Sequence, residues 1–485
     1  MAGLTGLWAV AAPLFANADE PAHATHAAAV ARGQLTGEEP DSASRARKGF
    51  LFVDLPEAYR LSSVDAGCFA TKSNHDAACF SIKGSETRNE PVATEAGHHP
   101  AAYYAVVGLI SRLAPTAAGA VYLMRVTTAL MTAVLLTIAV SALSRLPGAR
   151  IALAGLMVAL TPMVLSFGGA VNPSAPEIAA GIAAWACGLV LVFELRAGAE
   201  PSRGLVTQLG VAASALVLSR QISMLWLALI ALILAGLMGK DALRRLSRTT
   251  DARVWGVIVA GCGAAQLGWI LLAKGFELSV LPNAHARLSN GELVVRVLGR
   301  SSTWFIEMLG HLGWLDTRLL GLTYLLLTVA LGSLLLVAVA FGTGRYVVAM
   351  LGAIALTVLV PIVLEVWQAR SYGFYWQGRY TLPFAGGVPL LAALALQSDP
   401  ARRVVLRSRF IPALGGVVVV AQVLAFYQAM RRWSVGSHGP VNYVLHPNWS
   451  GPVPPSLLLV AYGATFAAFI VWLVGGDRSA PEPTP

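Results

Sequence analysis

The sequence predicts an all-α integral membrane protein with about 12 transmembrane helices, in a range of about 11 to 13. Of the 485 residues, 56% are apolar and only 12% are charged, whereas about 25% of the residues of a typical soluble protein are charged. Apolar runs of about 18 to 24 residues also recur along the chain, and each is long enough to cross a hydrocarbon core about 30 Å thick. A soluble fold could not bury so many runs of this length.

The expected spans follow from apolar runs bounded by Pro, Gly and Arg. They lie near residues 3–16, 119–143, 149–166, 174–194, 204–218, 221–238, 253–273, 319–341, 345–366, 380–397, 410–427 and 456–474. The first run is short, and Ala16-Asn17-Ala18 after it resembles a signal-peptidase site. Because no basic residue precedes this run, a tilted span or a start assigned too late fits better than a cleaved signal peptide.

Every second loop between these runs is short and basic, so we expect those loops to be cytoplasmic. They account for much of the net charge of +10, which therefore gives no reason to expect a nucleic-acid partner. The remaining segments are expected outside the cytoplasm: 17–118, 274–318, 367–379 and 428–455. These segments hold all nine histidines and most of the 25 acidic residues. Residues 1–475 are thus expected to form one transmembrane domain, followed by a short disordered cytoplasmic tail at 476–485.

The segment 17–118 is far longer than a connection between two helices requires, so we expect a small ordered subdomain. Within it, residues 101–115 are apolar but too short to span, and they suit a helix lying in the outer interface. Cys68 and Cys79 lie in the same segment. In an oxidising compartment they are expected to form a disulfide.

The stretch from Asp19 to His26 contains the sharpest group of ionisable residues. Pro21 suits the first turn of a helix with Asp19 or Glu20 at its cap. The dipole of such a helix favours an ionised carboxylate, which could act as a base or a metal ligand. His23 and His26 are three residues apart and share one face. The residues alone fit equally well a capped interfacial helix whose histidines face water.

A second group, Glu95 to Pro100, contains His98 and His99. With His23 these residues could bind a metal, but no spacing typical of a metal site supports one. We therefore predict no metal ligands, while a divalent metal ion stays an open alternative as a cofactor.

A third group combines Arg370 and Arg379 with the aromatic residues of the stretch 367–380. Arginine binds phosphate bidentately, and aromatic rings stack on sugars, although an interfacial aromatic belt with snorkelling arginines has the same composition. Neither a P-loop nor a dinucleotide fingerprint occurs, which excludes a pump driven by ATP hydrolysis within this chain.

Five short motifs together resemble the bacterial membrane proteins called domain of unknown function 2142. They are Asp19-Glu20-Pro21-x-His23, His99-Pro100-x-x-Tyr103-Tyr104, Asn172-Pro173, Gly313-Trp314-Leu315-Asp316-Thr317 and Gln377-Gly378-Arg379-Tyr380-x-x-Pro383. That family is similar to the GT-C glycosyltransferases, membrane enzymes that take a sugar from a polyprenyl-phosphate donor outside the cytoplasm. The resemblance implies a GT-C-like architecture, with Asp19 as the general base and Glu20 as the alternative. It implies further substrate-binding residues: His23, His99, Tyr103, Asn172, Arg220, Trp314, Asp316, Arg370, Arg379 and Tyr380.

We therefore expect a glycosyltransferase of the plasma (inner) membrane whose active face is extracytoplasmic. Its partners would be the lipid bilayer, a polyprenyl-phosphate-linked sugar and a cell-envelope glycan or glycolipid acceptor. A transporter or flippase for lipid-linked glycans is the main alternative, and a non-catalytic protein of envelope assembly is another. A transporter should carry ionisable residues near mid-membrane. The expected spans contain almost none, and Arg125 is the clearest case.

Overall fold

The computed structural model describes residues 1–39, 49–275 and 287–475. This part of the chain is mainly helical, and its strands form two sheets of two strands each. The prediction of a helical membrane protein is confirmed. The tail at 476–485 and part of the expected loop 274–318 lie outside the described residues.

Seven helices of the described chain are long and apolar enough to cross a membrane. They are α5 (Ala117–Leu143), α8 (Ser174–Arg196), α12 (Thr250–Leu272), α14 (Gly321–Phe341), α15 (Gly344–Gln368), α19 (Phe410–Val435) and α20 (Pro455–Gly475). Three bent pairs pass the same test only when each is taken as one span. They are α6 (Ala149–Ala159) with α7 (Pro162–Gly168), α10 (Ser223–Met238) with α11 (Lys240–Arg248), and the segment Gly378–Ala395 with α18 (Asp399–Arg407).

The described residues thus contain seven to ten candidate spans, and the expected number of about 12 is not confirmed. All the expected runs contain helical residues, but α1 (Ala2–Ala11) has 10 residues and α9 (Arg203–Ser219) has 17. At 1.5 Å per residue, α1 covers only about half of a 30 Å core. It packs against α5, α7 and α20, which shield it.

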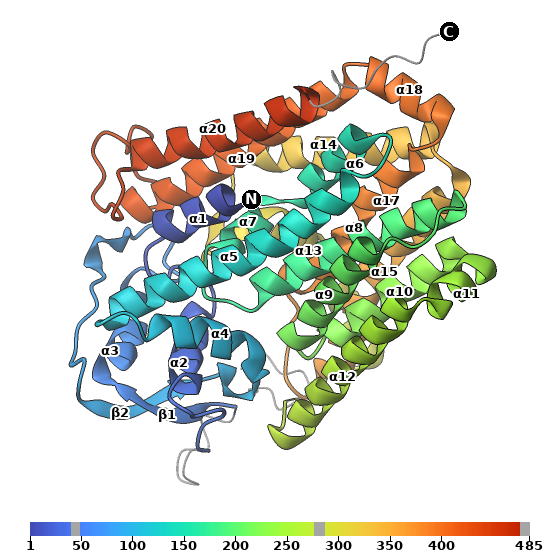
Figure 1. Ribbon diagram of the computed structural model, residues 1–485. Helices are drawn as coiled ribbons and strands as arrows, with labels where there is room; N and C mark the ends of the chain where they lie inside the picture. Colours follow the sequence, from blue (N-terminus) through green and yellow to red (C-terminus); the bar gives the residue numbers. More distant parts are fainter. Residues whose placement is uncertain (40–48, 276–286, 476–485) are drawn as a thin grey trace.

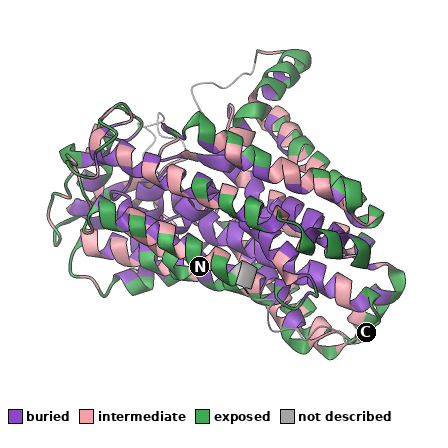
Figure 2. Ribbon diagram, turned by 90° about the horizontal axis from the view of Figure 1, so that it is seen from above, coloured by how far each residue is buried: buried purple, intermediate pink, exposed green. Residues whose placement is uncertain are grey.

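Helix α8 lies inside the bundle, and its residues are buried along nearly its whole length. Figure 2 shows that buried residues gather in the interior of the bundle and that exposed residues lie around it. It packs against α5, α9 and α10 (Figure 1). In contrast, α12, α14 and α15 expose large apolar side chains, among them Leu272, Leu336 and Val363. Such exposed apolar side chains are expected of helices that face lipid.

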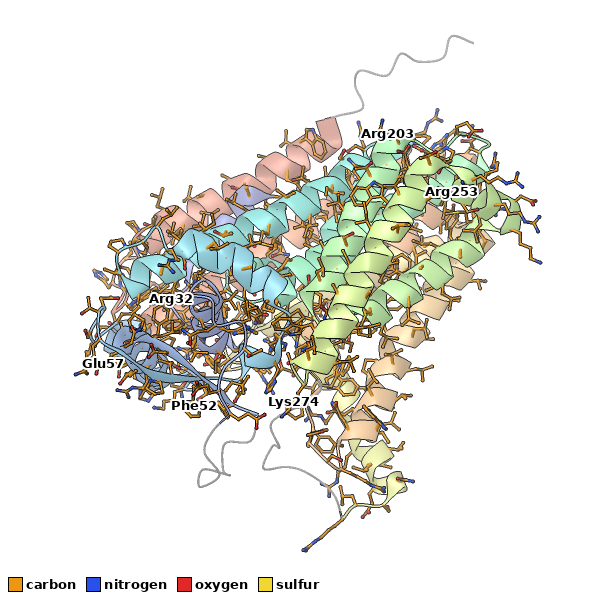
Figure 3. The ribbon with its side chains drawn as sticks, turned by 60° about the horizontal axis from the view of Figure 1, so that its bottom comes forward. Arg32, Phe52, Glu57, Arg203, Arg253 and Lys274 are labelled. Atoms are coloured by element: carbon orange, nitrogen blue, oxygen red, sulfur yellow. A yellow bond between two sulfur atoms is a disulfide. The ribbon has the colours of Figure 1, made fainter. Side chains whose placement is uncertain are left out.

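The short basic loops gather at one end of the bundle. Figure 3 shows Arg203 and Arg253 at the end opposite to Arg32 and Glu57. Segments at the basic end contact one another: Arg245 of α11 donates a hydrogen bond of 2.6 Å to the carbonyl of Leu195, near the end of α8. This separation follows the predicted alternation of the loops, and the assignment of the basic end to the cytoplasm stays a prediction.

The described part of the segment 17–118 forms a layer over the other end of the bundle (Figure 1). Its elements are α2 (Glu20–Val30), β1 (Leu51–Pro56), α3 (Glu57–Asp65), η2 (Ala66–Cys68), η3 (Ala77–Cys79), β2 (Asn89–Thr94), η4 (Ala96–His98) and α4 (Ala101–Ser111). Strands β1 and β2 are antiparallel, with Leu51 opposite Thr94. A disulfide joins Cys68 to Cys79, the pair that the sequence suggested.

Arg432 fastens the disulfide loop to the bundle. Its guanidinium donates to the carbonyls of Phe69 and His75, both at 2.7 Å, and pairs with Asp316 at 2.6 Å. These partners explain why α19 continues to Val435, eight residues beyond the end expected at 427. A basic residue in the last turn is stable there because carbonyl and carboxylate oxygens surround it.

The expected outer loop 274–318 contains a helix that the sequence analysis missed, α13 (Asn290–Gly310). Ser289 and Glu292 form a capping box at its start, a known signature of helix N-termini. Charged residues along α13 interrupt the apolar pattern, so a search for apolar runs passes over it. A hairpin of β3 (His311–Leu312) and β4 (Thr317–Arg318) follows the helix.

Glu20 and Arg125 form a fully buried ion pair between α2 and α5. Two parallel hydrogen bonds of 2.7 Å join them. Arg125 also donates to the carbonyls of Ala12 (2.7 Å) and Pro13 (2.6 Å) at the end of α1. Glu20 in turn accepts the N–H of Val171 at 3.0 Å. One arginine and one carboxylate therefore satisfy backbone groups at the ends of several segments, which a low-dielectric interior requires.

We predict that replacing Arg125 with Met lowers the free energy of unfolding by about 3 to 5 kcal/mol, because it leaves the Glu20 carboxylate buried without its partner. The measurement is the unfolding of the purified protein in mixed micelles. Arg145→Met is the control, since Arg145 and Glu194 form a partly exposed pair that should contribute no more than about 1 kcal/mol. Equal losses in the two variants would contradict the prediction.

Candidate active site

Asp19 lies in a tight turn between α1 and α2 with a left-handed backbone (φ 63°, ψ −1°). A non-glycine residue in this region costs on the order of 1 kcal/mol, although Asp is among the residues that tolerate it. The turn is held by the N–H of Ala18, which donates to the carbonyl of Gly313 at 3.1 Å. Asn172 donates its side-chain N–H to the carbonyl of Ala18 at 3.4 Å. The predicted Asn172 therefore supports the site through the backbone.

The expected start of α2 is confirmed, with Pro21 in its first turn. Asp19 occupies the N-cap position but makes no side-chain cap hydrogen bond, because the carboxylate pairs elsewhere. Glu20 is the first residue of the helix, and its carboxylate forms an ion pair with Arg125.

Asp19 instead forms an ion pair with Arg379, which is 360 positions away in the sequence. The two side chains differ in accessibility: that of Arg379 is 2% exposed, whereas that of Asp19 is 41% exposed. The fold thus brings together the two residues to which the resemblance assigns the main roles. It leaves the carboxylate open to a reactant and the guanidinium enclosed.

A second arginine, Arg220, shares the ring of Tyr380 with Arg379. The guanidinium carbons lie 4.6 Å (Arg220) and 5.2 Å (Arg379) from the ring centroid, within cation–π range. Phe167 of α7 also stacks on Arg379 at 4.9 Å. Arg220 donates to the hydroxyl of Ser174 at 2.9 Å. Three of the predicted residues therefore meet here, while Phe167 and Ser174 had no signal in the sequence.

Several N–H groups of these arginines are buried without a hydrogen-bond partner in the described part of the chain: Nε and Nη1 of Arg379 and Nε of Arg220. A buried guanidinium normally has its donors satisfied. Unmet donors on two neighbouring arginines indicate a place for an anion, and phosphate suits the planar fork of Arg.

Glu177 is a further acidic residue on this face of α8. It is fully buried in the first turn of the helix, three residues after Ser174, and its Oε1 accepts the hydroxyl of Ser223 at 2.7 Å. Glu177 was not among the residues predicted for the site, although an acidic residue in the first turn of an apolar helix is a detectable signal.

The histidines near the turn are buried, so the alternative in which they face water is wrong. His23 hydrogen-bonds the hydroxyl of Tyr104 through Nδ1 at 2.8 Å, and His26 packs on the same ring at 4.4 Å. His99 lies 5.7 Å from His23 between ring centroids and contacts Gln221. Burial, and then the charge of His99, lowers the pKa of His26 to about 3. The same two causes hold the pKa of His23 well below its usual value.

Four other predicted substrate-binding residues are held by protein partners. The hydroxyl of Tyr103 is hydrogen-bonded to that of Thr128 (2.8 Å), and the indole N–H of Trp314 donates to the carbonyl of Phe15 (2.9 Å). Asp316 forms an ion pair with Arg432. Arg370 donates a hydrogen bond to the side chain of Asn290 (2.7 Å). Arg370 is thus engaged at the start of α13 instead of beside Arg379. Among the described residues, no group of three or more His, Cys, Asp and Glu side chains could hold a metal ion.

An apolar cavity of about 270 Å³ lies next to the segment that carries Arg379. Helices α6, α13, α14, α15 and α19 contribute to its wall, together with α16 (Leu382–Ala385) and α17 (Gly387–Ala395). Thr381, which directly follows Tyr380, and Trp304 belong to its lining. The apolar cavity therefore reaches the last residue of the short turn Gly378–Thr381, which carries Arg379.

Comparisons with known proteins give one family and two solved structures. The model of the family described as "Predicted membrane protein (DUF2142)" matches residues 3–388. The structure is also similar to crystal structures of ArnT from Cupriavidus metallidurans, in the apo state (TM-score 0.40) and bound to undecaprenyl phosphate (TM-score 0.41). Both are 15% identical in sequence, and the alignments cover 97% of this chain and 74% and 75% of those chains. No curated protein matches the sequence.

We predict that lowering the pH reduces the free energy of unfolding more in the wild type than in a His26→Leu variant. In the unfolded chain a histidine gains a proton near pH 6.5, whereas folded His26 stays neutral down to a pKa of about 3. The contribution of His26 is therefore fully retained above pH 6.5 and is lost as the pH falls below it, by about 1 kcal/mol per pH unit. Thermal unfolding in detergent at pH 7.5 and 5.5 measures this. An equal drop in Tm for both proteins would rule it out.

Proposed function

The chain belongs to the family of predicted membrane proteins called domain of unknown function 2142, and we propose that it is a glycosyltransferase. In this proposal it transfers a sugar from a polyprenyl-phosphate donor to a cell-envelope acceptor at the extracytoplasmic face of the plasma membrane. One observation carries the proposal: the accessible carboxylate of Asp19 contacts the buried guanidinium of Arg379. Further N–H groups of that guanidinium have no partner among the described residues.

The donor phosphate is proposed to bind Arg379 and Arg220 beside the ring of Tyr380. The phosphodiester of the donor carries one negative charge, and the departing polyprenyl phosphate carries up to two. Two fixed guanidinium groups therefore stabilise the leaving group more than the bound donor, which is the requirement for catalysis. The neighbouring apolar cavity offers space for part of the polyprenyl chain.

Asp19 is proposed to act as the general base. The acceptor hydroxyl gives its proton to the carboxylate while its oxygen forms a bond to the anomeric carbon. The bond between that carbon and the phosphate oxygen breaks, and its electron pair stays on the phosphate. A single displacement of this kind inverts the anomeric centre. Because the donor phosphate competes with Asp19 for Arg379, donor binding frees the carboxylate for the acceptor.

The alternative base, Glu20, is less suited to this role. It is fully buried, and its oxygens accept two hydrogen bonds from Arg125 and one from Val171. A base must reach the acceptor proton directly or through one water. The exposed side chain of Asp19 meets this condition, and that of Glu20 does not.

The position of the site supports a donor carried by a lipid. Asp19, which pairs with Arg379, is the N-cap residue of α2. Helix α2 belongs to the layer at the end of the bundle opposite to the basic loops (Figures 1 and 3), and those loops are expected in the cytoplasm. Nucleotide sugars are cytoplasmic, so a transferase with this orientation needs a donor that has crossed the membrane.

We predict that Asp19→Asn lowers the rate of transfer by about 10² to 10⁴, the usual contribution of a general base. The assay uses the purified protein in liposomes that contain a polyprenyl-phosphate sugar and an envelope glycan acceptor. Binding of polyprenyl phosphate should be retained or tightened, because its competitor for Arg379 becomes neutral. Asp54→Asn is the control: Asp54 is exposed in β1, where its carboxylate binds Asn89.

Wild-type transfer by a well-folded Asp19→Asn variant would sink the assignment of the base. Lipid-linked sugars in cells with and without the gene separate the transferase from a flippase. Accumulated polyprenyl-phosphate sugar outside the cytoplasm fits transfer, whereas a glycan trapped on the cytoplasmic leaflet fits transport.

A further inference from the structure

The segment 373–378, which directly precedes Arg379, is held by buried carboxylates from two helices. Glu307 of α13 accepts the N–H of Gly378 at 2.6 Å. Glu365 of α15 accepts the N–H of Trp376 at 2.9 Å. These two backbone donors are two residues apart, and Gln377 between them is extended (φ −125°, ψ 146°). The carboxylates therefore fix the backbone at the residues just before the arginine of the site.

Arg300 completes this arrangement from α13. Its guanidinium donates to the carbonyl of Trp376 at 3.4 Å and lies 3.8 Å from Glu365. It also stacks on Phe374 at 5.1 Å. Side chains of α13 and α15 thus hydrogen-bond both the backbone N–H groups and a backbone carbonyl of the segment. The segment therefore has little freedom to shift along α13.

Gly378 allows the segment to approach α13 closely. A Cβ at this position would lie 2.1 Å from the carbonyl oxygen of Trp304 and 2.9 Å from the Cβ of Glu307. No side chain fits at such distances without a shift of the backbone. Glycine here brings the N–H of residue 378 within reach of Glu307, and the next residue is Arg379.

Carboxylates in such a place are costly for the fold. A buried carboxylate must be paired or hydrogen-bonded, and an apolar pair of similar volume is often at least as stable. Glu307 and Glu365 are buried, and each binds a backbone N–H of one short segment. They are therefore better explained by the position of that segment than by the stability of the bundle.

We propose that Glu307 and Glu365 are positioning residues that orient Arg379 toward the donor phosphate. This inference rests on the proposed function, because it assigns a task to the same arginine. Charged hydrogen bonds hold the backbone before Arg379, so that its guanidinium meets the phosphate without reorganisation. Neither carboxylate contacts the donor in this scheme.

The test is a double-mutant cycle between Glu307 and Arg379, read as the affinity of the purified protein for polyprenyl phosphate in nanodiscs. Glu307→Ala should weaken binding by about 10-fold to 100-fold, the effect of a misplaced binding group. In an Arg379→Ala background the same change should have no further effect. Glu307→Gln should restore much of the affinity, because an amide oxygen still accepts the N–H of Gly378. Glu292→Ala, on the exposed start of α13, is the control.

Hydrogen exchange of the peptide 373–380 provides a readout that does not need the lipid. Glu307→Ala should speed its exchange, and Glu292→Ala should not. If the wild type fails to bind polyprenyl phosphate while Glu307→Ala loosens this peptide, the proposed function fails, and what stands is that Glu307 holds the backbone before Arg379. Equal losses of affinity with and without Arg379, or unchanged affinity and exchange in Glu307→Ala, would overturn the inference.

Discussion

The buried ion pair of Glu20 and Arg125 is the interaction on which the site depends. Helix α1 ends inside the bundle, where its last carbonyls have no water to bind. Arg125 of α5 donates hydrogen bonds to those carbonyls. Glu20 accepts hydrogen bonds from Arg125 and from the N–H of Val171, which lies just before α8. The start of α2 is thereby fixed against α1, α5 and α8 at once. Asp19 is the residue next to this anchor, so its position follows from that of Glu20.

Neighbouring residues thus take different tasks because the backbone turns between them. The left-handed conformation of Asp19 directs its carboxylate away from Arg125 and toward Arg379. Glu20 meets its partner in the dry interior, while Asp19 remains partly exposed. The two main residues of the site come from distant parts of the chain. Asp19 lies in the turn after α1, and Arg379 follows the segment whose backbone is hydrogen-bonded to Glu307. A mobile loop alone would not hold two such groups in register.

The sequence predicted much of the fold but only part of the site. Apolar runs located helical segments throughout, and the alternation of basic loops matches the two ends of the bundle, because both signals are local. The pairing of Glu20 with Arg125 joins residues 105 positions apart, and no local pattern indicates it. Arg370 was predicted to bind substrate together with Arg379, because composition does not report which arginine is buried. The charged helix α13 was missed because its pattern is amphipathic rather than uniformly apolar.

The proposed roles of Arg379 and Asp19 can be tested by a cryo-EM structure of the protein with polyprenyl phosphate bound. We expect phosphate oxygens within about 3 Å of the guanidinium groups of Arg379 and Arg220, with the carboxylate of Asp19 released from Arg379. The polyprenyl chain should begin in the apolar cavity beside Thr381. A phosphate bound at the basic end of the bundle, with the pair of Asp19 and Arg379 intact, would exclude Arg379 as the residue that binds the donor phosphate.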